Sequence, residues 1–134
     1  MTSALQPLDQ IIETFALLDD WEGRFQYVLD LGKTVPDMPE ALKTPETEVK
    51  GCTSKVWMAP EIRDGTFHFQ ADSNAQIVKG LIGILMSIYQ DKTVEEIKSI
   101  DVEGIFSELG LEQNLSPNRR NGFFSMVEKI RAFS

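Results

Sequence analysis

The chain contains one cysteine, Cys52, which lies in the sequence VKGCTSKVW. Positive charge near a thiol lowers its pKa from about 8.5 and raises the fraction present as the nucleophilic thiolate. Lys50 and Lys55 supply such charge. Gly51 lets the backbone turn tightly just before the thiol, and Ser54 is a small hydrogen-bonding neighbour. A free cysteine is also often a buried apolar residue, so these residues alone leave a reactive thiol and a packing residue both open.

The scarcity of histidine and cysteine limits the reactions that the Cys52 thiol could carry out. His68 is the only histidine, and alternation places it opposite Phe67 and Phe69, on the solvent face of a strand. Acyl transfer by a cysteine needs a histidine base within reach, and dithiol chemistry needs a second cysteine. A single thiolate can instead attack a sulfur that a partner enzyme has already activated. Sulfur transfer is therefore the favoured chemistry, with a redox-sensing thiol and an inert structural cysteine as alternatives.

Length and charge indicate the number of domains and exclude some classes of partner. A chain of 134 residues is expected to form a single domain over residues 1–134. Its net charge of −8 argues against nucleic acid and against an anionic membrane surface. No apolar run reaches the roughly 20 residues of a membrane span, and the N-terminus does not resemble a signal peptide. We therefore expect a cytoplasmic protein, where a thiol stays reduced.

The elements that position Cys52 follow from hydrophobic periodicity. Apolar residues at helical spacing occur on both sides of a stretch in which apolar and polar residues alternate, that is, with a period of two. Gly32 is expected in left-handed conformation at a helix end, and Gly80 and Gly83 are expected to permit close packing, for example on a sheet. The expected helices cover residues 8–19, a segment from Trp21 to Gly32, residues 74–90, segments capped by Thr93 and Asp101, and a last helix that starts at Ser116-Pro117.

The stretch with period two predicts strands over residues 47–51, 54–63 and 66–71. Asp64-Gly65 is a strong hairpin signal, and Pro60 indicates an edge or a bulge. The order of elements predicts an α+β domain, in which a small antiparallel three-stranded sheet is covered by helices mainly on one face. Cys52 then lies in the first connection of the sheet.

Three segments resemble the SufE-type sulfur acceptor proteins. Residues 49–57, VKGCTSKVW, match V-x-G-C-x-S-x-V-W of that family. Residues 72–81, DSNAQIVKGL, form the second segment, and residues 115–122, LSPNRRNG, match L-[ST]-P-x-R-x-x-G. The segments keep the order and spacing of the family over nearly the full length. Their combination is specific, whereas G-C-x-S alone is weak.

The resemblance implies a protein that accepts sulfur from a PLP-containing cysteine desulfurase of the SufS or CsdA type and stimulates it. Cys52 would take the sulfur as a persulfide and pass it to a downstream scaffold for iron–sulfur cluster assembly. PLP belongs to the desulfurase, so no cofactor is expected on this chain. The implied fold is shared with U-type iron–sulfur scaffolds, but one cysteine is too few to hold a cluster. A desulfurase regulator in which Cys52 is structural remains an alternative.

The resemblance also singles out Asp72 and Arg119. Asp72 ends the last predicted strand beside a helix start, where antiparallel pairing can bring it near the cysteine segment and let it hold that segment shut. Arg119 lies in the first turn of the last helix, where a cation opposes the helix dipole. Contact with the cysteine segment or with a partner is therefore its expected role. Glutamine is frequent in the family at the positions of Thr53 and Lys55, so these differences bear on partner preference.

Overall fold

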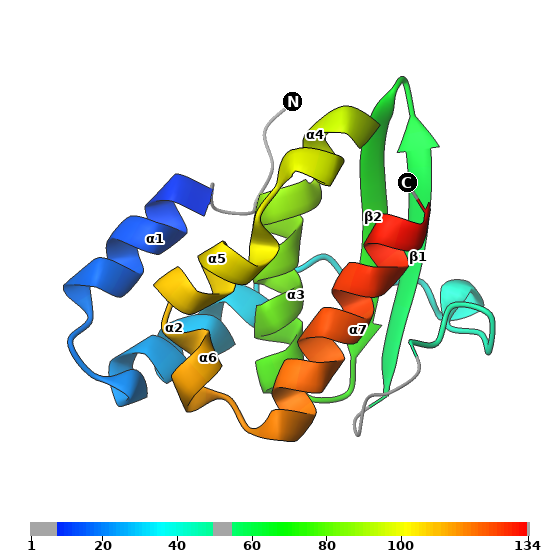
Figure 1. Cartoon of the computed structure of the whole chain (residues 1–134). Coiled ribbons are helices and arrows are strands. Elements are labelled where there is room, and N and C mark those ends of the chain that lie inside the picture. Colours follow the sequence, from blue (N-terminus) through cyan, green and yellow to red (C-terminus); the bar gives the residue numbers. More distant parts are fainter. Residues whose placement is uncertain (1–7, 50–54, 134) are drawn as a thin grey trace.

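A computed structural model describes residues 8–49 and 55–133 of the chain (Figure 1). Helices precede and follow a single β-hairpin, as the order of sequence patterns predicts. No helix in the described ranges is long and apolar enough to cross a membrane. The elements are α1 (Leu8–Leu17), α2 (Trp21–Gly32), the 3₁₀ helix η1 (Glu40–Leu42), β1 (Val56–Arg63), β2 (Thr66–Ser73), α3 (Gln76–Tyr89), α4 (Val94–Ser99), α5 (Val102–Glu108), α6 (Leu111–Asn114) and α7 (Pro117–Phe133).

Two helix starts confirm the capping residues expected from the sequence, Thr93 and Asp101, and Asp20 caps a third helix. The Asp20 carboxylate accepts a hydrogen bond from the Gly23 N–H at 2.9 Å at the start of α2. Thr93 and Glu96 form a reciprocal capping box at α4, which satisfies two backbone donors that the helix leaves free. Asp101 caps α5 by accepting from the Gly104 N–H at 3.1 Å. These local contacts explain why the helix boundaries could be predicted closely.

The hairpin between β1 and β2 is built as expected, with the two strands antiparallel from Val56↔Ser73 to Arg63↔Thr66. Asp64 and Gly65 both have positive φ, 55° and 82°. This is the conformation of a type I′ turn, whose twist matches that of the flanking strands.

The prediction of a third strand over residues 47–51 is wrong, because the described sheet has two strands. Glu48 forms only an isolated bridge with Trp57, flanked by hydrogen bonds from Val49 N–H to Val56 C=O and from Met58 N–H to Thr47 C=O, both 2.8 Å. In antiparallel register the next hydrogen-bonded pair would be residues 45 and 60. Both are proline, and proline has no N–H to donate, so the ladder ends after one bridge. Residues 50–51 lie outside the described part.

The face of the hairpin that carries Met58, Phe67, Phe69 and Ala71 is buried. It packs against α3 and α7, which lie on one side of the sheet (Figure 1). Helix α3 is buried along most of its length and forms the centre of the core. The expectation of helices mainly on one face is thereby confirmed.

The glycines of α2 and α3 serve a close contact between these two helices rather than a contact with the sheet. A Cβ atom at Gly80 would overlap the Val28 carbonyl group, and one at Gly32 would lie 2.9 Å from the Gly80 nitrogen. Gly32 is the last residue of α2 and does not have the positive φ that was expected for it. Its small size is needed for packing, so the prediction of a left-handed helix end at Gly32 is wrong.

The opposite face of the hairpin carries the cross-strand pairs Trp57↔Asp72 and Glu61↔His68. His68 lies opposite Phe67 and Phe69, as predicted. It is half-buried, with its Nδ1 3.3 Å from an Asp91 carboxylate oxygen and its Nε2 3.0 Å from the Thr66 hydroxyl.

Residues 33–48, here called the strap, connect α2 to the bridge at Glu48. The strap begins beside α3, where Val35 lies close to Gly83, and Figure 1 shows η1 on the other side of the sheet from α3.

Candidate functional site

Cys52, Gly51 and Ser54, together with their neighbours Lys50 and Thr53, lie outside the described residues. The residues on either side, Val49 and Lys55, are well anchored. Val49 pairs with Val56 through the 2.8 Å bond described above. Lys55 donates its N–H to the Asn74 side-chain oxygen at 3.2 Å and accepts from the Asn74 N–H at 3.3 Å. The chain thus enters and leaves the cysteine segment at the end of the sheet where β2 gives way to α3.

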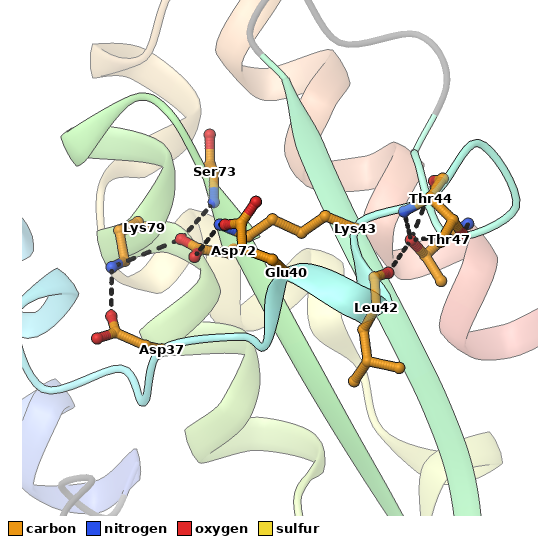
Figure 2. A network of polar contacts seen from close by, with 9 residues as sticks. All are labelled: Asp37, Glu40, Leu42, Lys43, Thr44, Thr47, Asp72, Ser73 and Lys79. Atoms are coloured by element: carbon orange, nitrogen blue, oxygen red, sulfur yellow. Dashed lines mark hydrogen bonds and ion pairs between the residues drawn. The ribbon is translucent and has the colours of Figure 1, made fainter.

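Asp72, on β2, is the centre of a group of charged residues at this end of the sheet (Figure 2). Its carboxylate lies 3.1 Å from the Lys43 ammonium and 3.5 Å from the Lys79 ammonium. It also accepts the Ser73 N–H at 2.8 Å. Its side chain is only 9% exposed, and a buried charge requires such partners.

The pKa of Asp72 results from opposing influences. Burial by itself raises the pKa of Asp72, because it disfavours the charged form. The hydrogen bonds from the Ser73 N–H and the Lys43 ammonium, together with the charge of Lys79, outweigh burial and hold the pKa of Asp72 below its ordinary value. Asp72 is therefore an ionised residue at neutral pH, and it binds the strap and α3 at the same time.

The Lys43 side chain has three described contacts. Its ammonium lies 2.9 Å from the Glu40 carboxylate within η1 and 3.1 Å from Asp72, and it sits 5.2 Å from the centre of the Trp57 ring. The hydrogen bonds to Glu40 and then to Asp72 raise the pKa of Lys43. The contact with the Trp57 ring is a cation–π interaction.

Arg119 lies in the first turn of α7 and is exposed. Its backbone N–H donates to the Ser116 hydroxyl at 3.3 Å, which confirms the predicted helix start. Helix α7 begins at the end of the molecule where β1 starts and β2 finishes (Figure 1). The described contacts do not join Arg119 to the group around Asp72.

Sequence reasoning selected Asp72 but missed the two lysines that bind it. Lys79 lies within the segment DSNAQIVKGL, on the helix that follows the strand carrying Asp72. Its position could therefore have suggested the ion pair with Asp72. Lys43 lies in a proline-containing stretch without periodicity, and nothing in the local pattern connects it with residue 72. No group of three histidine, cysteine, aspartate or glutamate side chains suited to a metal ion occurs within residues 8–49 and 55–133.

Comparison with known proteins assigns the chain to a family. The family model described as "SufE: Fe-S metabolism associated domain" matches residues 9–134. The chain belongs to the SufE family. A SufE-like protein of Rhizobium etli, named as uncharacterized, is 45% identical over 128 residues, which are 92% of this chain and 86% of that protein. A second uncharacterized SufE-like protein, from Rhizobium meliloti, is 43% identical over 129 residues, 93% of this chain and 92% of the relative.

A solved structure shows the same fold. The solution structure of a hypothetical protein from Thermus thermophilus superimposes with a TM-score of 0.75 and 23% sequence identity, covering 93% of this chain and 90% of that one. Membership of the SufE family associates the chain with iron–sulfur metabolism. Two of the three family segments meet in the fold, through the hydrogen bonds between Lys55 and Asn74 and the pairing of Trp57 with Asp72.

Proposed function

We propose that this protein accepts sulfur from a PLP-dependent cysteine desulfurase, stimulates that enzyme, and relays the sulfur to iron–sulfur cluster assembly. The observation that carries the proposal is the family match over residues 9–134 of a chain whose single cysteine lies in the VKGCTSKVW segment. The SufE family is associated with iron–sulfur metabolism, and one thiol without a histidine base suffices for sulfur transfer.

The reaction proposed for Cys52 is a thiol–persulfide exchange. The Cys52 thiolate attacks the outer sulfur of a persulfide on the desulfurase. A sulfur–sulfur bond forms at Cys52 while the bond within the desulfurase persulfide breaks, and the desulfurase cysteine leaves as a thiolate. No net oxidation or reduction occurs, because one persulfide is exchanged for another. A second exchange of the same kind passes the sulfur to a scaffold.

The described surroundings support this role. The segment is held at both ends by backbone hydrogen bonds at the edge of a rigid hairpin, and reactive residues commonly lie in segments that a rigid scaffold positions. Arg119 is exposed and presents positive charge at this end of a chain with net charge −8, whereas the Lys55 ammonium, also exposed, is paired with the Glu48 carboxylate at 3.2 Å. Such charge suits a partner surface that is acidic around its active site.

Sulfur transfer can be tested by intact-mass measurement. The protein is incubated with free cysteine and with desulfurases of the SufS and CsdA types in turn. We expect the wild type to gain the mass of about one sulfur atom per protein, roughly 32 Da, and to lose it again when a thiol reductant is added. Cys52→Ser should gain no sulfur. Equal loading of both proteins would contradict the proposal.

An assay of desulfurase stimulation distinguishes a protein that accepts sulfur from one that only binds the desulfurase. The rate at which the desulfurase releases alanine is measured with wild type and with Cys52→Ala, which retains the rest of the docking surface. We expect stimulation to depend on Cys52, because the acceptor thiol regenerates the free desulfurase. Full stimulation by Cys52→Ala would indicate a non-catalytic regulator instead. Rapid oxidation of Cys52 by peroxide without any transfer would indicate a redox-sensing thiol.

A further inference from the structure

The strap contains a stretch in which no residue is buried. Every residue from 39 to 46 is exposed or half-buried, whereas Met38 before this stretch and Val49 beyond it are only 3% and 6% exposed. Residues 39–46 are here called the flap, which includes η1 on the side of the sheet opposite α3 (Figure 1). Since burial of apolar surface is the dominant favourable term in folding, the flap is held in place mainly by polar contacts.

Lys43 connects the flap to the sheet. Its ammonium lies 3.1 Å from the Asp72 carboxylate on β2 and 5.2 Å from the centre of the Trp57 ring on β1, and Figure 2 shows the lysine side chain extending toward Asp72. Among the described residues, the other polar contact that joins the flap to an element outside the strap is a 3.4 Å hydrogen bond from the Lys129 ammonium to the Glu46 carbonyl. Loss of the Lys43 charge should therefore loosen the flap, and salt should loosen it less strongly because it screens ion pairs.

The two ends of the flap are anchored. Thr47 follows the flap, and its carbonyl accepts the Met58 N–H of β1 at 2.8 Å. The Thr47 hydroxyl donates to the Leu42 carbonyl at 2.5 Å and accepts the Thr44 N–H at 3.0 Å, which keeps the flap folded on itself. Met38 anchors the other end by burial. A segment with fixed ends and no buried residue between them is of the kind that opens locally, without unfolding of the whole domain.

We propose that the flap opens about Met38 and Thr47 while the core stays folded, and that Lys43 is the latch that keeps it closed. In the closed state the flap places the Lys43 side chain over the outer face of the hairpin, against Trp57 and Asp72. In the open state this face is available to solvent or to a partner. The inference is independent of the proposed sulfur transfer, because the motion needs neither a desulfurase nor the cysteine.

Opening of the flap leaves Asp72 with other partners. The Lys79 ammonium on α3 lies 3.5 Å from its carboxylate, and the Ser73 N–H donates to it at 2.8 Å. A buried charge is strongly destabilising only when it is left uncompensated, so the open state is accessible without unfolding of the sheet or of α3. Lys79 also provides a matched control. Its contact with Asp72 survives opening of the flap and is lost only when the domain unfolds.

Amide hydrogen exchange, measured residue by residue by NMR on the whole protein, tests the local opening. The N–H groups of Leu42 and Lys43 are hydrogen-bonded within the flap at 2.9 and 3.0 Å and report its opening, whereas the Phe67 N–H reports the core. After division by the intrinsic rates, we expect the flap N–H groups to exchange about 100-fold faster than that of Phe67. Urea below the unfolding transition should accelerate Phe67 steeply and the flap only slightly, because local opening exposes little surface.

Charge removal at the two lysines tests the latch. Lys43→Met, which keeps an apolar side chain against Trp57, should accelerate the flap and Phe67 alike by about fivefold, because the Lys43 contact is lost in both openings. Lys79→Met should accelerate Phe67 by about threefold and leave the flap within about twofold of wild type. Lys43→Arg, which retains the charge, should also stay within about twofold. In the wild type, an increase from about 0.05 M to about 0.5 M NaCl should accelerate the flap by about threefold.

The same measurements can overturn each part of the inference. Equal rates and equal urea dependence for the flap and Phe67 would mean that the flap opens only on global unfolding. Equal acceleration of the flap by Lys79→Met and Lys43→Met would exclude Lys43 as the latch. Exchange of the Met58 N–H at the rate of the flap would exclude a hinge at Thr47. Circular dichroism melting shows whether each variant is folded, and if Lys43→Met is not, absence of a salt effect on the wild-type flap excludes the latch.

Discussion

Replacement of Gly80 by alanine tests the contact that joins α2 to α3. The added methyl group would overlap the Val28 carbonyl group and side chain. Overpacking a core costs roughly 1–3 kcal/mol, and the upper part of that range applies because the obstacle is backbone, which cannot change rotamer. Alanine regains about 1 kcal/mol of helix propensity over glycine. We therefore expect a net loss of about 2 kcal/mol in the free energy of unfolding.

Gly83 provides the matched control within the same helix. A Cβ atom there would lie 3.3 Å from the Leu31 carbonyl oxygen and 3.4 Å from a Val35 methyl group, distances that a small adjustment relieves. The gain in helix propensity then offsets most of the strain, so Gly83→Ala should be near neutral, within about 1 kcal/mol of wild type.

Urea denaturation followed by circular dichroism measures both variants. With a slope of about 2 kcal/mol per M of urea, Gly80→Ala should lower the midpoint by about 1 M without changing the slope. Equal midpoints for Gly80→Ala and Gly83→Ala would refute the reasoning, because the two changes are chemically identical and differ only in what the new methyl group meets. A compensating shift of α2 is also detectable, since it would change the near-ultraviolet signal of Trp21.

Three further predictions concern the candidate site and its supports. Asp72→Asn should destabilise the fold by about 2 kcal/mol at pH 7, because it removes a shielded carboxylate between two ammonium groups. The pKa of Asp72 is lowered in the folded state, so its contribution to stability is present above the unfolded pKa of about 3.9 and is lost as the pH falls through the folded value. The urea midpoints of variant and wild type should therefore converge in acid. Arg119→Ala should weaken stimulation of the desulfurase by raising the apparent KM for this protein, with an unchanged melting temperature; an unchanged KM would exclude a docking role. Thr93→Ala should cost about 1 kcal/mol by removing the capping box of α4, and it should leave sulfur uptake at the wild-type rate, because α4 contributes no residue to the site.

Local patterns determined most of the elements. Asp20, Thr93 and Asp101 satisfy backbone donors within three residues of themselves, so their effect on a helix start does not depend on the rest of the fold. Asp64 and Gly65 likewise define a turn within four residues.

The third strand shows where a local pattern is not enough. Its residues have the alternation of a strand, but pairing depends on what lies opposite, and Pro45 falls opposite Pro60 only once the register is known. The contact of Gly32 with Gly80 was missed for a similar reason, because 48 positions separate the two residues and neither helix indicates its partner.

The sequence by itself determined the family, through three short segments, and with it the candidate nucleophile Cys52. It could do so because the type and order of residues around a thiol are local properties of the chain. Only the tertiary structure decided that Asp72 binds Lys43 and Lys79, and that Lys43 also covers Trp57. Charges attract across space at any separation along the chain, so the partners of a buried carboxylate are set by packing and not by spacing.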